Sequence, residues 1–239
     1  GRAPEASRVT SCRAAWSCST RCRARRAASS SVARWRRHSS RLLELDHPTK
    51  AGWSARRFRE TVEPLRDVAL RAEAEADPES ETLPALLVVT GAWVPLETAM
   101  ADVVWKGRPG RVEMPPTTPA SFAAIDEVRV PQAAAYLLLD VDTGPDLQNV
   151  RPEDALIELR RRGRTPLTID EGVALLVQQP GILAERNAYS LLASREPGTQ
   201  RVPAIWTSFK APRLGWCWDR NPHTWLGSAS ASGRVGPAS

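Results

Sequence analysis

Side chains that could do chemistry are concentrated in one short stretch near the C-terminal end, residues 213–227. This stretch holds three of the nine Trp residues, the only Cys beyond residue 41 (Cys217) and the last of the three His residues (His223). Trp is costly to expose and rarely clusters without a packing or binding role. The stretch therefore predicts either part of the core or the wall of a binding site, and the sequence alone leaves both open.

A binding site in this stretch would combine aromatic walls with a few polar groups. Trp216 and Trp218 are two residues apart and share a face if the segment is a strand, and we expect Trp206 of the preceding strand to join them. His223 titrates near neutral pH and could act as an acid, a base or a ligand. Such a surface suits a flat ligand such as a sugar, a base or a cofactor ring, although no particular cofactor is indicated. The candidate pocket residues are Trp216, Trp218, Asn221, His223, Arg164 and Asp170, the last two at its rim.

Two pairs of acidic residues could also serve catalysis. Asp170 and Glu171 are adjacent on a predicted helix and point about 100° apart. Helix capping explains Glu171, which leaves Asp170 as the candidate. Asp140 and Asp142 end a predicted strand in a D-x-D pattern similar to that of haloacid-dehalogenase-type phosphatases.

The phosphatase pattern departs from this sequence at Gly144, where a Thr or a small apolar residue is expected. No convincing downstream lysine and acidic pair follows. The other interpretation is a solvent-facing turn over residues 142–146. A phosphatase is thus only a remote alternative.

We expect no metal site. Cys12, Cys18 and Cys22 do not have the close-paired spacing of zinc or redox motifs. His38 and His47 lie in or near the N-terminal segment, so His223 lacks partners for a metal.

The charge of the chain is divided unevenly. Residues 1–41 contain 11 Arg, 9 Ser and 8 Ala and have a net charge of +10, whereas the remainder has a net charge of −4. We expect this N-terminal segment to be disordered. Because the sequence opens with Gly1 and Arg greatly outnumbers Lys, the segment is interpreted as a mis-called start, with a solvated linker or a nucleic-acid-binding arm as alternatives. The mildly acidic remainder is not expected to bind nucleic acid.

Hydrophobic periodicity and capping residues predict the main elements. A helix over residues 54–76 should be split by Pro64, and further helices are expected over 152–163 and from Thr168 to the residues before Pro180. Strands are predicted at 83–90, 134–141, 189–194, 201–208 and 214–218, with a turn at 210–212 and an irregular, Pro-rich connection at 108–119. Continuous apolarity in the first two strands indicates that both of their faces are covered.

These elements indicate an α+β fold: a single compact domain over residues 42–234 with a mixed or antiparallel sheet, followed by a flexible end at 235–239. We also expect the C-terminal residues and the turn at 165–168 to fold against each other. No secretory signal or membrane span is visible, which favours a soluble, cytoplasmic protein.

Several strings in the C-terminal half resemble a family. They are RGRTPLTIDEG (162–172), VPAIW (202–206), GWCW (215–218) and NPHTWLGSAS (221–230). Together they resemble a domain-of-unknown-function family found mainly in actinobacteria, over roughly residues 42–234. The resemblance implies a fold unit and a compartment but no reaction.

Two functions of different class remain open. One is a ligand-binding protein or enzyme that uses the candidate pocket. The other is a non-catalytic module whose exposed aromatic residues dock another protein.

Overall fold

The computed structural model describes residues 35, 39–90, 94–184 and 188–237. The helices are α2 (His47–Lys50), α3 (Ala55–Val62), α4 (Arg66–Glu75), α5 (Leu96–Asp102), α6 (Pro152–Arg161) and α7 (Ile169–Gln178). The longer strands are β1 (Leu83–Val89), β6 (Ala135–Val141), β10 (Arg201–Ser208) and β11 (Ala211–Trp218). The short strands are β2 (Val104–Trp105), β3 (Arg108–Pro109), β4 (Arg111–Val112), β5 (Ala123–Ala124), β7 (Thr165–Pro166), β8 (Ala188–Ser190), β9 (Ser194–Arg195), β12 (Leu226–Ser228), β13 (Ser230–Ala231) and β14 (Gly233–Val235).

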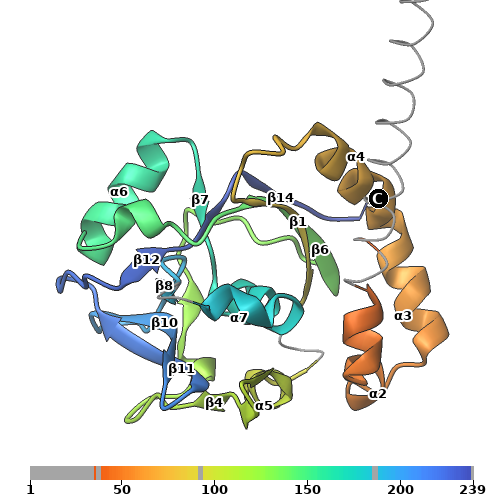
Figure 1. The fold of residues 1–239 in the computed structure, drawn as a ribbon, viewed down its shortest axis with the longest axis horizontal. Coiled ribbons are helices and arrows are strands. Elements are labelled where there is room, and N and C mark those ends of the chain that lie inside the picture. Colours follow the sequence, from red (N-terminus) through yellow and green to blue (C-terminus); the bar gives the residue numbers. More distant parts are fainter. Residues whose placement is uncertain (1–34, 36–38, 91–93, 185–187, 238–239) are drawn as a thin grey trace, which may run out of the picture.

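Two sheets organise these elements (Figure 1). One is antiparallel with the strand order β1-β6-β14. The other is mixed, with the order β12-β8-β10-β11-β4, in which β12 and β4 pair in parallel with their neighbours. The remaining short strands form two-stranded pairs, so the α+β prediction is confirmed.

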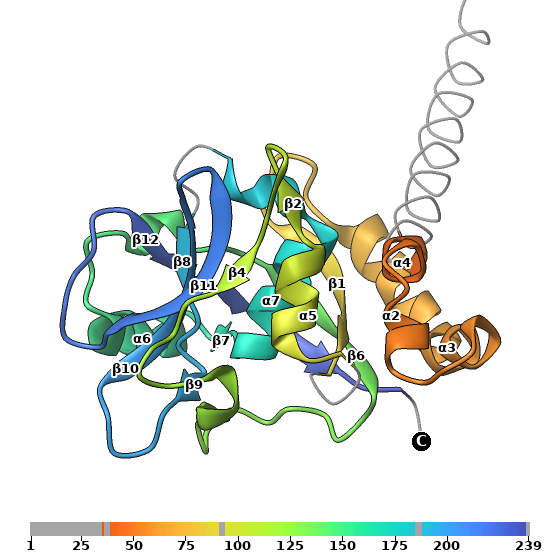
Figure 2. The ribbon, with the colours of Figure 1, turned by 90° about the horizontal axis from the view of Figure 1, so that it is seen from below.

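The three-stranded sheet is covered by helices on both faces. Figures 1 and 2 show α7 on one side and α3 with α4 on the other. Residues 85–88 of β1 and 135–138 of β6 are accordingly buried without alternation. The continuous apolar sequence of these two strands therefore correctly predicted a sheet that is covered on both faces.

The helix boundaries follow from local capping chemistry. The Ser54 hydroxyl accepts the first-turn N–H of Arg57 at 3.2 Å, and a 3-10 turn (Glu63–Leu65) containing Pro64 separates α3 from α4. Pro152 opens α6, and Gly163 follows it with a φ of +67°. Thr168 and Glu171 form the predicted capping box of α7.

Helix α7 lies between the two sheets and is buried on nearly all sides. The Tyr136 hydroxyl, from β6, donates to Glu171 at 2.8 Å, and the Tyr189 hydroxyl, from β8, donates to the Gly172 carbonyl at 3.0 Å. A helix that is apolar all round belongs in a core. Both sheets therefore fix the position of α7.

Strand pairing joins the C-terminal residues to the segment before α7. β13 pairs with β7, and the Leu167 N–H donates to the Ala229 carbonyl at 3.0 Å. β14 then pairs with β6 and ends at Val235. The expectation that the C-terminal residues pack against the turn at 165–168 is confirmed.

Four local features differ from expectation. The 108–119 connection contains β3 and β4, and β4 pairs with β11. The hairpin turn falls at Phe209 and Lys210 rather than at 210–212, and β8 ends at Ser190. Trp35, inside the expected N-terminal tail, is buried in the core. Residues 39–41, also inside the expected disordered tail, are helical. The other residues of that prediction, 1–34 and 36–38, lie outside the described part of the chain.

Candidate functional site

The register of the β10–β11 hairpin divides the Trp-rich stretch between two faces. Because Phe209 and Lys210 alone form the turn, Trp216 lies opposite Pro203 and Trp218 lies opposite Arg201. Trp206 lies opposite Arg213 and so points to the other face. The expectation that Trp206 joins Trp216 and Trp218 was wrong.

Trp216, Trp218 and Arg201 form a cluster on one face of the hairpin. The two indole rings meet edge to face with centroids 4.9 Å apart. The Arg201 guanidinium lies 4.9 Å from the Trp216 ring and 5.8 Å from the Trp218 ring, within the range of cation–π attraction. Trp216 donates its indole N–H to the Pro115 carbonyl, whereas 46% of Trp218 is exposed. This cluster is a partly exposed aromatic surface.

His223 belongs to a second aromatic cluster, on the face of the hairpin that packs toward α6. Its ring lies 5.5 Å from that of Trp225, which lies 6.2 Å from that of Trp206. The Nε2 atom of His223 is buried and has no hydrogen-bond partner among the described residues. Burial lowers the pKa of His223. Asn221, two residues earlier, is exposed. His223 is thus neutral near pH 7 and separate from the Trp216–Trp218 face.

Arg164 is engaged in a structural ion pair. It donates to the Asp140 carboxylate at 2.6 Å and to the Ser230 hydroxyl at 2.7 Å. Burial alone would raise the pKa of Asp140, but hydrogen bonds from Thr82 and Arg164 outweigh it and lower the pKa. Asp142 accepts the Gly144 N–H at 2.8 Å. The D-x-D segment is therefore a strand end followed by the turn that the alternative interpretation predicted.

Cys217 lies in the small core under α6, away from solvent. Burial raises the pKa of its thiol to about 12. Since the thiolate is the reactive form, Cys217 is an unreactive core residue.

A sizeable concavity lies elsewhere, at the N-terminal ends of α5 and α7. This hollow, which we call the Asp170 hollow, has a volume of about 660 Å³. Small-molecule sites typically span about 300–1,000 Å³. Its described lining residues are Thr90, Pro95, Leu96, Glu97, Pro119, Ala120, Phe122, Val130, Pro131, Gln132, Ala133, Ile169 and Asp170. It is lined by none of the other five candidate pocket residues, so the structure places only Asp170 in this concavity.

Asp170 and Glu171 diverge as the helix geometry predicts. Glu171 is fully buried, and its carboxylate receives hydrogen bonds from Arg234, Tyr136 and the Thr168 N–H. Asp170 is partly exposed and lines the hollow instead. The Glu171 carboxylate therefore belongs to the interior, whereas Asp170 lies at the wall of the hollow.

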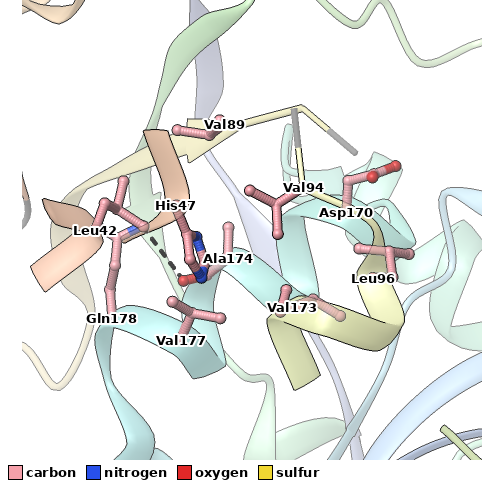
Figure 3. Close-up of a pocket in the computed structure, with 11 residues that line it drawn as sticks. Leu42, His47, Val89, Val94, Leu96, Asp170, Val173, Ala174, Val177 and Gln178 are labelled. Carbon is pink, nitrogen blue, oxygen red and sulfur yellow. Dashed lines mark hydrogen bonds between the residues drawn. The ribbon is translucent and has the colours of Figure 1, made fainter. Parts of the chain in front are cut away.

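A second, smaller hollow adjoins the first and shares Leu96 and Asp170 with it. Its volume of about 30 Å³ is enough for a water molecule. Figure 3 shows Val94 and Leu96 beside Asp170 at one end of the α7 face, and His47 near the other end. His47 Nε2 lies 3.0 Å from an Asp102 oxygen that also accepts from Lys50 Nζ at 2.6 Å.

His47 predicts a pH dependence of stability. Burial lowers the pKa of His47, and its hydrogen bond to Asp102 offsets only part of this. The unfolded chain therefore binds a proton at a higher pH than the folded protein does. The contribution of His47 to stability is complete above the unfolded pKa of about 6.5 and is lost as the pH falls toward the lowered folded pKa.

We expect urea unfolding to give a smaller free energy of unfolding at about pH 5.5 than at about pH 7.5. His47→Gln should reduce this difference. The lowered pKa of His223 acts in the same direction, so His223→Gln serves as a comparison and the double variant should reduce the difference further. An unchanged pH difference in both single variants would contradict this prediction.

Within the described ranges, no group of three or more His, Cys, Asp or Glu side chains is placed to hold a metal ion. Likewise, no helix in the described part of the chain is long and apolar enough to cross a membrane.

The sequence pointed to Asp170 but not to the hollow it lines. Most of its other described walls come from residues 90, 95–97, 119–122 and 130–133, where no periodic pattern or motif is present. The only available signal was an excess of Pro in these connections, which favours rigid irregular backbone but does not show that two such segments meet.

Comparison with known proteins gives one match. No curated protein matches the chain significantly, and no solved structure does either. The sequence profile of a family described as "Family of unknown function (DUF5701)" matches residues 41–237. Because this match spans most of the chain, the protein belongs to this family of unknown function.

Proposed function

We propose that this protein binds a small organic ligand in the Asp170 hollow. The observation that carries the proposal is the hollow itself: a concavity of about 660 Å³ with apolar walls and a few polar groups. Three of its lining residues are Pro95, Pro119 and Pro131. Their fixed backbone favours a preformed wall, which lowers the entropic cost of binding.

The first test is to fill the hollow without changing its charge. Ala133→Trp and Ala120→Trp place an indole on two of its walls, and Ala120 is exposed, so the larger side chain is tolerated. Ala124→Trp, at an exposed position of β5 outside the hollow, is the matched control. Ligand-observed NMR with a fragment set of amines, carboxylates and alcohols should detect binders to the wild type and to Ala124→Trp.

Both filling variants should lose these binders while retaining the wild-type melting temperature. Binders that persist in both filled variants, or a fragment set with no binder at all, would overturn the proposal.

A second candidate is docking of another protein through Trp218. The exposed 46% of this side chain and its stacking with Arg201 favour this alternative. In this case the candidate residues Trp216 and Trp218 form the contact surface beside Asn221, whereas His223 and Arg164 lie outside it. Self-association or partner binding that Trp218→Ala abolishes and Ala133→Trp leaves intact would favour docking over a ligand site.

A further inference from the structure

We infer that one edge of the molecule, formed by two neighbouring β-hairpin turns, binds the surface of an anionic lipid bilayer. The turns are residues 106–107, between β2 and β3, and residues 209–210, between β10 and β11. We call residues 104–111 together with 209–210 the double-turn edge. No described lining residue of the Asp170 hollow belongs to it, so this inference is independent of the proposed function.

The pairing of β4 with β11 brings the two turns side by side. These strands are parallel, with Arg111 opposite Arg213. Three residues before this pair stand Arg108, in β3, and Lys210, in the β10–β11 turn. Both β2 and β3 contact β11. Figure 2 accordingly shows the end of β2 and the β10–β11 turn at the same edge of the molecule.

Three of the four turn residues are ones that this backbone disfavours. Lys106, Phe209 and Lys210 have φ values of 48°, 50° and 64°, in the left-handed region that is costly for residues with a Cβ. Turns of this kind usually contain Asn or Gly at such positions. Because 85% of Phe209 is exposed, burial offsets little of its cost. A bulky apolar residue at a strained and exposed position indicates a role outside the fold.

The double-turn edge combines exposed apolar groups with cations. Val104 is 54% exposed and lies beside the half-buried Trp105. The Lys106 Nζ atom lies 5.6 Å from the centre of the Trp105 ring. The exposed cations of the edge are Lys106, Arg108, Arg111 and Lys210.

The charge of these four cations is not neutralised within the described part of the chain. Residues 103–112 and 207–212 contain no Asp or Glu. The nearest acidic residues in sequence are already paired, Asp102 with Lys50 and Glu113 with Arg213. Among the described residues, none of the four cations has an ion pair or a side-chain hydrogen bond. The edge therefore attracts an anionic surface.

A bilayer suits this combination better than a nucleic acid does. Segments that bind at a membrane surface insert apolar side chains among the lipid headgroups while neighbouring Lys and Arg side chains contact anionic lipids. Trp is favoured at the same depth, which suits Trp105. Single-stranded nucleic acid is usually bound by aromatic side chains along a groove. Phe209 instead lies at the tip of a hairpin.

The small number of Phe residues permits a probe at the tip itself. The chain has three, of which Phe58 and Phe122 are buried and Phe209 is exposed. The full chain is labelled with fluorophenylalanine, and Phe209→Asn assigns the Phe209 signal, since Asn is accepted in a left-handed turn. Fluorine NMR is recorded with nanodiscs of equal parts phosphatidylcholine and phosphatidylglycerol. Compared with unlabelled nanodiscs, a spin label on the lipid acyl chains should broaden the Phe209 signal more than the other two.

A probe at the tip is needed because residues 1–41 have a net charge of +10 and should themselves attract anionic lipid. Binding through that segment alone would leave the Phe209 signal without this additional broadening and would overturn the inference. A Phe209 signal that responds to a single-stranded oligonucleotide and not to the nanodiscs would overturn it as well. Nanodiscs of phosphatidylcholine alone should broaden the signal much less.

Charge variants test the cations of the edge. Lys106→Gln with Lys210→Gln should weaken binding to vesicles of the mixed composition by roughly 25-fold, because each Lys or Arg near an anionic surface contributes about fivefold. Arg59→Gln with Arg71→Gln removes the same charge from exposed positions of α3 and α4, away from the edge (Figure 2), and should weaken binding by less than about twofold. Equal weakening by the two double variants would show attraction by net charge alone and would contradict the assignment.

A second pair of variants tests the apolar contact. Phe209→Asn should weaken vesicle binding by roughly 10-fold, because it removes an aromatic ring that inserts among the lipids. Ile157→Asn is the matched control, since Ile157 is 62% exposed on α6. It should leave vesicle binding unchanged. The same binding by the wild type and Phe209→Asn would exclude insertion of the tip.

Discussion

Replacing Arg234 with Met is expected to lower the free energy of unfolding by about 3–5 kcal/mol, because it leaves a buried carboxylate without its counter-charge. The Arg234 side chain is 5% exposed and that of Glu171 is not exposed at all. Arg234 donates to the two Glu171 oxygens at 2.6 and 2.7 Å. The pair lies in the interior of the protein, where solvent does not screen it.

The network around this pair accounts for its expected effect. Arg234 also donates to the Thr165 hydroxyl at 2.5 Å and to the Pro166 carbonyl at 2.7 Å, and so joins β14 to β7 and α7. Burial raises the pKa of Tyr136 far above its usual value, so its hydroxyl stays protonated and donates to Glu171. Loss of the guanidinium removes four hydrogen bonds and the only cation that contacts Glu171 in the described residues.

Urea unfolding followed by circular dichroism measures this loss, with Arg220→Met as the control. Arg220 is 67% exposed and lies 3.4 Å from Glu153, so its removal should change stability by less than about 1 kcal/mol. The double variant Glu171→Gln with Arg234→Met should be more stable than Arg234→Met alone, because Gln is neutral and still caps Thr168. Equal losses for Arg234→Met and Arg220→Met would contradict the prediction.

The sequence predicted those parts of the fold that depend on neighbouring residues. Ser54, Pro152 and Thr168 begin helices through bonds or backbone restraints within one turn. The two apolar strands were recognisable because four consecutive buried residues occur in each. The divergence of the Asp170 and Glu171 side chains followed from helix geometry together with the capping box.

The parts of the fold that the sequence did not predict depend on contacts between segments that lie far apart in the chain. Strand β4 is two residues long and exists because β11 pairs with it about a hundred residues later. The faces of the Trp residues depend on the hairpin turn, whose two residues, Phe209 and Lys210, have φ values of 50° and 64°. Such a turn usually contains Asn or Gly. Without that signal the turn was predicted too far along the chain. A shift of one residue in the pairing of two strands moves every side chain to the opposite face of the sheet.

The candidate site also contains one part with a local sequence signal and another part without one. Asp170 was identified because it lies on a well-predicted helix, whereas the Pro-rich walls opposite it have no local signature. The Trp-rich stretch drew attention through composition, but composition does not determine which face a side chain occupies. Its indoles are divided between two clusters that pack on opposite sides of one hairpin.

The second large effect is expected at Gly144, which begins the turn after the D-x-D segment. Gly144→Ala should lower the free energy of unfolding by about 2–5 kcal/mol, through a left-handed backbone and a close approach together. Its φ is +67°, and an added Cβ would lie 2.3 Å from the Ser228 carbonyl oxygen of β12. The Ser228 N–H also donates to the Gly144 carbonyl at 3.3 Å, so the two backbones are held together.

Gly163→Ala separates the cost of the left-handed backbone from the cost of the close approach to β12. Gly163 has the same φ of +67°, but nothing lies within 4 Å of an added Cβ, so only the backbone strain of about 1–2 kcal/mol should appear. Equal losses in the two variants would show that β12 moves aside and that the close approach carries no cost. A larger loss for Gly144→Ala would show that the close approach of β12 requires glycine at this position. The absence of the Thr or small apolar residue of a phosphatase motif would then follow from backbone packing against β12 and not from chemistry at the Asp140 and Asp142 carboxylates.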